Sequence, residues 1–295
     1  MKKINLIALV ALMGFMSSCN SNNEKTDTNH GTEDKKVLLH MPLEKRLEIA
    51  KRYDDVNDFH EGLAKVCLNG KLGFIDKNGN EVVPCIYDKV SNFSEEMAIV
   101  EQKDKEGFVN KYGKLVVPCK YNDVEDFSEG LARVSHNRKC GFIDKNGNEV
   151  IPCIYDGARD FNDGLARVEL NGKRGFIDKS GKQVIPCIYD RVEDFNDGLA
   201  RVKLNGKYGF IDKSGKQVIP CTYDYVSNFE DGLVAVKLND KWGFVDKNGK
   251  SITPVEYDGI KHIVPLGIIK AFGENENGNF TIHYYDTTGK YLGSD

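Results

Sequence analysis

The chain has 295 residues, of which 40% are hydrophobic and 29% are charged, a balance typical of a globular protein. Its 41 Lys and Arg residues stand against 45 Asp and Glu residues, which leaves a net charge of −4 with the two signs interspersed. This pattern lacks the basic surface that nucleic-acid-binding proteins use, so we expect no nucleic-acid partner.

The first 19 residues predict a bacterial lipoprotein signal peptide. Lys2 and Lys3 give a basic start, and residues 4–16 are uncharged and mostly apolar but too few to span a membrane, which takes about 20 residues. The segment ends in Met16-Ser17-Ser18-Cys19, which resembles the lipobox whose cysteine is acylated. We expect Cys19 to anchor the chain in the cell envelope, with Asn20 beside it favouring the outer membrane, and no other membrane contact. An ordinary signal peptide is the alternative.

Residues 20–40 are predicted to be a disordered tether. The stretch from Asn20 to Lys36 contains almost no apolar side chain, so it cannot bury enough surface to offset the entropy of ordering. The remaining segment, 41–295, is predicted to be one repeat domain.

From Tyr53 onward the sequence repeats with a period of 34 residues. The same positions recur as Tyr, Phe, Gly-Phe and Pro in six units, and a seventh unit is degenerate. A period this strict indicates a repeat architecture in which each unit packs on its neighbours. The Gly-Phe pairs begin at Gly73, Gly107, Gly141, Gly175, Gly209 and Gly243.

One unit predicts a β-hairpin followed by further short strands. In residues 199–204 apolar and charged side chains alternate, which is typical of a half-buried strand. Asn205-Gly206 then favours a two-residue turn, and residues 207–212 form the returning strand.

The rest of the unit predicts a third strand at 217–219, which Pro220 either ends or marks as an edge because proline has no N–H for the ladder. Residues 223–226 follow as a fourth short strand or a single helical turn. Each unit is therefore a three- or four-stranded β-meander.

The run from Gly232 to Pro254, GLVAVKLNDKWGFVDKNGKSITP, resembles the WG repeat (also called the KWG repeat) of bacterial proteins. The likeness extends over about Leu47 to Asp295 and implies a repeat architecture without implying any particular reaction. The tryptophan of the motif occurs only as Trp242, whereas the glycine after it is present in every unit. We infer that the glycine belongs to the scaffold and that the residue before it is free to vary.

The predicted fold is all-β, with tandem 34-residue β-meanders forming an open solenoid-like array. A closed six- or seven-bladed β-propeller is the alternative, because residues 48–52 align with a later strand and would supply the strand that closes a ring. The degenerate seventh unit favours the open array, since such arrays end in atypical capping repeats. Residues 43–52 would then form a short amphipathic helix that caps the first unit.

The residues that could carry chemistry favour packing and turns over catalysis. Seven cysteines follow Cys19, an odd number, and no histidine shares the spacing of the five that recur in register, so we expect no metal site. The Asp-Lys-Asn-Gly loops lack the ligands of a calcium site and are interpreted as hairpin turns. No pairing of a nucleophile with a histidine is visible, so we expect no catalytic residue, no cofactor and no enzyme. The cysteines in register are Cys85, Cys119, Cys153, Cys187 and Cys221.

The units can be compared with one another, and the positions that vary between them are candidates for recognition. Arg, Tyr and Trp dominate binding hot spots, so we expect residues of these types at variable positions to share a recognition face. We predict an envelope-anchored binding or scaffold protein whose partner is a protein, a peptide or a glycan. The alternatives are an envelope hydrolase with a site between repeats and a purely structural spacer. The candidate binding residues are Arg133, Arg167, Arg201, Arg174, Tyr208 and Trp242.

Overall fold

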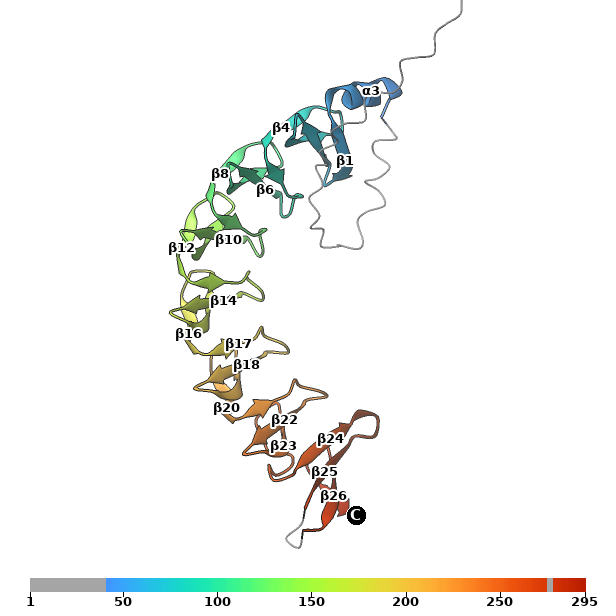
Figure 1. The fold of residues 1–295 in the computed structure, drawn as a ribbon, viewed down its shortest axis with the longest axis vertical. Coiled ribbons are helices and arrows are strands. Elements are labelled where there is room, and N and C mark those ends of the chain that lie inside the picture. The colour runs from blue at the N-terminus through green and yellow to red at the C-terminus, as the bar shows by residue number, and fades with distance from the viewer. Residues whose placement is uncertain (1–40, 275–277) are drawn as a thin grey trace, which may run out of the picture. The chain divides into compact units, whose positions relative to one another are not determined.

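The computed structural model describes residues 41–274 and 278–295, and almost all of them lie in β-strands or turns (Figure 1). The predicted signal peptide, Cys19 and the predicted tether lie outside the described residues. Within the described part of the chain, no helix is both long and apolar enough to cross a membrane.

The domain begins with helix α3 (Leu43–Arg52), which caps the first sheet. Glu44 in its first turn and Lys51 and Arg52 in its last turn complement the helix dipole. Ile49 is buried and packs in one cluster with Phe59 and Ile75 of the first sheet. The alternative of a capping helix is therefore confirmed, and this segment supplies no strand to close a ring.

Each unit forms an antiparallel sheet whose strands follow one another in sequence order. The hairpin turn between the two middle strands has two residues with positive φ, as at Asn171 (53°) and Gly172 (73°), which is the geometry that the Asn-Gly pair predicts.

The seven sheets are made of these strands in chain order. The first sheet contains β1 (Asp55–His60), β2 (Leu63–Leu68), β3 (Lys71–Asp76) and β4 (Glu81–Tyr87), and the second contains β5 (Lys89–Val90), β6 (Met97–Gln102), β7 (Lys105–Asn110) and β8 (Leu115–Tyr121). The third contains β9 (Asp123–Val124), β10 (Leu131–His136), β11 (Lys139–Asp144) and β12 (Glu149–Tyr155), and the fourth contains β13 (Gly157–Ala158), β14 (Leu165–Leu170), β15 (Lys173–Asp178) and β16 (Gln183–Tyr189). The fifth contains β17 (Arg191–Val192), β18 (Leu199–Leu204), β19 (Lys207–Asp212) and β20 (Gln217–Tyr223), and the sixth contains β21 (Tyr225–Val226), β22 (Leu233–Leu238) and β23 (Lys241–Asp246). The seventh contains β24 (Gly259–Ile263), β25 (Ile268–Glu274), β26 (Phe280–Asp286) and β27 (Tyr291–Ser294), with a 3₁₀ turn, η1 (Val264–Leu266), after β24.

The last strand of a unit is longer than predicted. β20 continues through Pro220 to Tyr223, and it lies at the outer edge of its sheet, where a residue without an N–H is tolerated. Of the two interpretations of Pro220, the one that places it on an edge strand is confirmed. The short strand β21 then opens the next sheet, so a helical turn at this place is wrong.

No sheet combines strands from the two ends of the described chain. The strands of the first sheet all come from residues 55–87, and those of the last sheet all come from residues 259–294. The units therefore form an open array, as predicted, and not a ring closed by a shared strand. The seventh unit keeps four strands although its sequence is degenerate.

Within residues 41–121, and likewise within the described part of 122–295, the hydrophobic core is divided into layers between consecutive sheets. In one layer, Phe176 and Tyr189 of the fourth sheet pack against Val202 and Ile211 of the fifth. Each layer therefore joins only neighbouring units, which is the packing of a repeat protein.

Polar contacts join consecutive sheets at the Tyr-Asp step. Asp190 lies between β16 and β17, where Oδ1 accepts a hydrogen bond from Lys173 Nζ and Oδ2 accepts one from the Gly206 N–H at 3.0 Å. The lysine belongs to the fourth sheet and the glycine to the hairpin turn of the fifth. This aspartate explains why each constant tyrosine is followed by an acidic or amide side chain. Asp88, Asp156, Asp224 and Asp258 bond in the same way to the lysine 17 residues before them.

Candidate functional site

The strand register brings three variable positions of a unit into one line across its sheet. In the fourth sheet Gly157 lies opposite Glu169, Glu169 opposite Arg174, and Arg174 opposite Tyr189. Directly opposed residues share a face of an antiparallel sheet, so these side chains are neighbours. We call each such line a variable row. The other rows are Asp55-Cys67-Leu72-Tyr87, Lys89-Glu101-Glu106-Tyr121, Asp123-Ser135-Cys140-Tyr155, Arg191-Lys203-Tyr208-Tyr223 and Tyr225-Lys237-Trp242-Tyr257.

Every variable row ends on the constant tyrosine, which belongs to the scaffold. Tyr189 is only 3% exposed and packs in the core layer between the fourth and fifth sheets. At the other end of that row, Gly157 lies on the short strand β13, and the equivalent Arg191 and Tyr225 are exposed. A row therefore passes from an open end, where the side chain is free to vary, to a buried end, where it is fixed.

The sequence analysis identified the residue before the constant glycine as variable, but it missed the row member that lies opposite this residue on the preceding strand. The missed position is Glu169 in the fourth sheet and Lys203 and Lys237 in the next two. It follows the arginine position by two residues on the same strand, so strict alternation would have placed it on the same face. A comparison of the units at this position would have found it.

Three of the candidate arginines make ion pairs or hydrogen bonds within the repeat domain. They lie on the same face of their sheets as the variable rows, two residues before a row member on the same strand. The side chains of Arg133, Arg167 and Arg201 are 13%, 22% and 22% exposed. Arg167 Nη1 donates to the Val192 carbonyl at 3.1 Å, and Arg201 Nη1 donates to the Val226 carbonyl at 3.2 Å, so each bonds to the following sheet.

Arg133 is held within its own unit by two carboxylates. Its Nη2 lies 2.7 Å from Asp123 Oδ2 and 2.9 Å from Glu125 Oε1. Burial alone would lower the pKa of the Arg133 guanidinium, but the bonds to the two carboxylates outweigh it and raise that pKa. The three arginines are therefore constrained by contacts within the fold, and their part in recognition stays a prediction.

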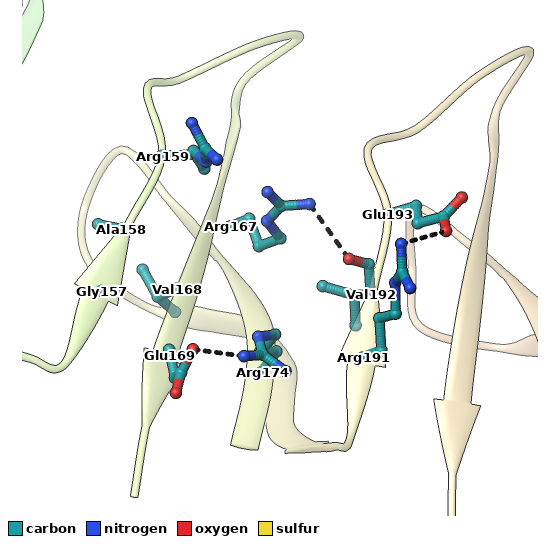
Figure 2. A pocket seen from close by; sticks show the side chains of 10 residues that line it. All are labelled: Gly157, Ala158, Arg159, Arg167, Val168, Glu169, Arg174, Arg191, Val192 and Glu193. Carbon is teal, nitrogen blue, oxygen red and sulfur yellow. Dashed lines mark hydrogen bonds and ion pairs between the residues drawn. The ribbon is translucent and has the colours of Figure 1, made fainter. Parts of the chain in front are cut away.

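A cavity of about 560 Å³ lies between the fourth sheet and strand β17 of the fifth (Figure 2). This size falls within the range of small-molecule sites, about 300–1,000 Å³. Of the six candidate residues, the cavity brings together Arg167 and Arg174 and adds two arginines that the sequence analysis did not single out. It is lined by Gly157, Ala158, Arg159, Arg167, Val168, Glu169, Arg174, Arg191, Val192 and Glu193.

The cavity exists at this place because two side chains are small. Gly157 and Ala158 form β13, whereas the equivalent second position is valine in Val56, Val90, Val124, Val192 and Val226. A Cβ built on Gly157 would have Glu169 Cβ as its nearest neighbour, at 3.8 Å, and its backbone is not in the left-handed region. The glycine therefore leaves room that a side chain would fill.

Positive charge predominates in the lining, which contains four arginines and two glutamates. Arg174 donates to the Asp190 carbonyl. Arg174 also pairs with Glu169 at 2.9 Å, and Arg191 pairs with Glu193 at 3.3 Å (Figure 2). Among the described residues, no carboxylate lies within ion-pair distance of the exposed Arg159 guanidinium. The arginines thus present N–H donors that their intramolecular partners do not use up.

Aromatic side chains replace arginine in the rows of the next two sheets. Lys203 Nζ lies 4.9 Å from the centre of the Tyr208 ring, and Lys237 Nζ lies 5.7 Å from that of Trp242. Tyr225, which is 46% exposed, meets the Trp242 ring edge to face at 5.8 Å. Tyr208 and Trp242 therefore hold equivalent places in consecutive rows, but neither lines the cavity.

The in-register cysteines are half-buried beneath the strands. In four of the five, Cys85, Cys119, Cys153 and Cys187, the Sγ atom lies 3.5–4.0 Å from the carbonyl oxygen of the valine 19 residues earlier. Burial raises the pKa of the Cys85 and Cys221 thiols to about 11, so these groups are protonated at neutral pH. In the part of the chain that the structure describes, no three His, Cys, Asp or Glu residues are grouped to hold a metal ion.

The comparisons with known proteins identify the repeat. The profile of the WG containing repeat matches seven consecutive segments: 45–71, 73–105, 107–140, 141–173, 175–208, 208–242 and 242–264. No curated protein matches the chain.

Among solved structures, Kluyveromyces lactis Hsv2 is 9% identical with a TM-score of 0.34, over 80% of this chain and 95% of that one. A eukaryotic initiation factor is 11% identical with a TM-score of 0.32, over 79% and 85% of the two chains. The extracellular domain of BT4673 from B. thetaiotaomicron is 11% identical with a TM-score of 0.28, over 79% and 41%. Similarity this low carries no inference about function.

Proposed function

The chain belongs to the WG containing repeat family, and from that premise we propose that it is a non-catalytic binding protein of the bacterial cell envelope. In this proposal Cys19 carries the lipid anchor, and the open repeat array presents the variable rows to a protein, peptide or glycan partner. Repeat arrays suit this role because equivalent positions of successive units make an extended surface.

The observation that carries the proposal is the convergence of the variable positions. A scaffold needs the constant glycine, the constant tyrosine and the buried strand positions, and these are the same from unit to unit. The positions that differ most, such as Arg174, Tyr208 and Trp242, meet in one row per sheet with an open end. This separation of constant and variable positions is expected of a protein that recognises a partner, whereas a spacer has no need of it.

The composition of the rows favours sheets four to six as the recognition surface. Their rows contain two arginines, two lysines, two tyrosines outside the scaffold position and the single tryptophan. Arg, Tyr and Trp are the residue types most enriched at binding hot spots.

A row transplant tests the proposal in the full-length lipidated protein. Tyr225→Lys, Lys237→Glu and Trp242→Glu, made together, replace the sixth row with the second row of the same chain. Because those residues already occupy the same register in another sheet, we expect the fold to persist. The matched control is Ser214→Asn, an exposed turn change that copies Asn78 of the first unit.

The measurement is quantitative crosslinking of the protein in intact cells, followed by identification of the adduct. We expect one discrete adduct with the wild type and the control, and its loss with the transplant. No adduct in any protein, or the same adduct with the transplant, would contradict the proposal and favour the spacer. The anchor is tested separately by Cys19→Ser, which should release the chain from the membrane fraction.

A further inference from the structure

The arginine-lined cavity lies where the sequence of the array departs from its repeat. It lies between the fourth sheet and β17, where Gly157 and Ala158 take the place of larger residues. Arg191 and Val192 occupy the equivalent two positions one unit later, and Tyr225 and Val226 occupy them two units later, where the Tyr225 ring contacts Trp242. The Gly-Ala pair therefore leaves open a place that a tyrosine occupies in the sixth sheet.

The donors around this hollow fit an oxyanion. Guanidinium groups are planar forks of N–H donors that match the oxygens of a carboxylate, phosphate or sulfate. Arg159 and Arg167 come from the β13–β14 side of the fourth sheet, Arg174 from β15 and Arg191 from β17, so they approach the space from different strands (Figure 2). Arg159 has no carboxylate partner among the described residues, so a ligand oxygen meets no competitor there.

The other arginines are already oriented. Arg174 is fixed by the Asp190 carbonyl and Glu169, and Arg167 by the Val192 carbonyl. A side chain that is held before the ligand arrives loses less conformational entropy on binding, which favours affinity. The glutamates in the lining also limit the site, since they repel an anion that does not place its charge beside the guanidinium groups.

We propose that this cavity is a binding site for an oxyanion carried by a ligand of sugar size, with Arg159 as the principal anion-binding residue and Gly157-Ala158 as the element that admits the ligand. This inference rests on the proposed binding function and adds to it the chemistry of one part of the partner. The same chemistry is available from an acidic sugar or from the phosphate of a lipid head group.

Calorimetric titration of the full-length protein in detergent tests the site, with glucuronate and inorganic phosphate as soluble probes and vesicles of phosphatidylglycerol as the lipid arm. Saturable binding of glucuronate alone assigns the acidic sugar, and binding of phosphate and vesicles assigns the head group. Binding of none of the three overturns the proposal.

Three variants locate the binding. Arg159→Ala should weaken it about tenfold or more, the loss expected for a charge-assisted hydrogen bond. Gly157→Tyr, which copies Tyr225 and fills the hollow, should abolish it. Lys182→Ala removes the same charge from an exposed turn and should change the affinity less than about twofold.

Equal losses with Arg159→Ala and Lys182→Ala would show unspecific attraction, and wild-type binding by Gly157→Tyr would place the ligand elsewhere; either result overturns the site. Circular dichroism of Gly157→Tyr distinguishes a filled cavity from a lost fold, and Ala158→Val is the milder substitute if that fold is lost. The row transplant in the sixth sheet leaves this cavity unchanged. If the calorimetric titration fails and the crosslinking experiment succeeds, the anion site is therefore refuted but the proposed binding function is not.

Discussion

The constant glycine before each phenylalanine should not tolerate a larger residue, because the neighbouring strand lies too close to leave room for a Cβ atom. A Cβ on Gly175 would lie 2.3 Å from the Ile185 carbonyl oxygen and 2.7 Å from the Pro186 carbonyl carbon. Real Cβ atoms do not approach within 3.0 Å, so in Gly175→Ala strand β16 must move away by at least about 0.7 Å. Gly157→Ala is the matched control, because its Cβ would meet nothing closer than 3.8 Å.

The expected cost follows from the contacts that the shift disturbs. Arg174 pairs with Tyr189 and Phe176 with Ile185 on either side of Gly175. Weakening one or two ladder hydrogen bonds costs about 0.5–1.5 kcal/mol each, and overpacking adds about 1–3 kcal/mol. We expect Gly175→Ala to destabilise the fourth sheet by about 2–4 kcal/mol, and Gly157→Ala to be neutral or to stabilise it by up to about 1 kcal/mol.

Hydrogen exchange is the suitable assay, because unfolding of a repeat array need not be two-state. Amides of β15 and β16 should exchange at least about tenfold faster in Gly175→Ala than in the wild type, and those of the seventh sheet should change little. Equal exchange in Gly175→Ala and the wild type would refute the argument from close approach. So would an equal effect of the two substitutions.

Three further predictions concern the core, the thiols and acid stability. Phe161→Ala removes a 2% exposed ring that packs on Phe142 at 4.8 Å, and should destabilise the third and fourth sheets by about 3–5 kcal/mol, measured by hydrogen exchange; a change below about 1 kcal/mol would contradict it. Cys221, whose thiol pKa burial raises to about 11, should be alkylated at neutral pH more than tenfold more slowly in the native than in the denatured protein. The hydrogen bond from Lys173 holds the pKa of Asp190 below its usual value, so the stability it contributes is present above the unfolded pKa and lost as pH falls below about 4. Asp190→Asn should therefore flatten the acid limb of the stability curve, and an unchanged limb would argue against the linkage.

Local periodicity made much of the fold predictable. Alternation of apolar and polar residues at 199–204 and the Asn205-Gly206 pair define a hairpin because both act over a few residues. The end of the third strand was misplaced because proline breaks an interior strand, and only the sheet order reveals that Pro220 lies on an edge strand. The helical alternative for residues 43–52 was confirmed through Ile49, whose burial depends on the first sheet.

The candidate site was predictable only in part. Comparison of the units identified Arg174, Tyr208 and Trp242 as variable. It could not show that Arg167 and Arg201 bond to the following sheet, because their partners are backbone carbonyls, which sequence patterns do not reveal. Arg159 was missed because no recurring pattern marks it. Arg191 was missed as a cavity residue because only the packing of β17 beside the fourth sheet brings it near the other arginines.

The sequence by itself determined that this chain is an open series of β-meanders with a constant glycine and tyrosine, because strand alternation and turn chemistry are encoded within each unit. Only the tertiary structure decided that Glu169 and Arg174 form one row with Gly157, because register joins residues from separate strands. It also decided that the small side chains of Gly157 and Ala158 leave a cavity beside Arg159, because the space depends on how one sheet packs on the next.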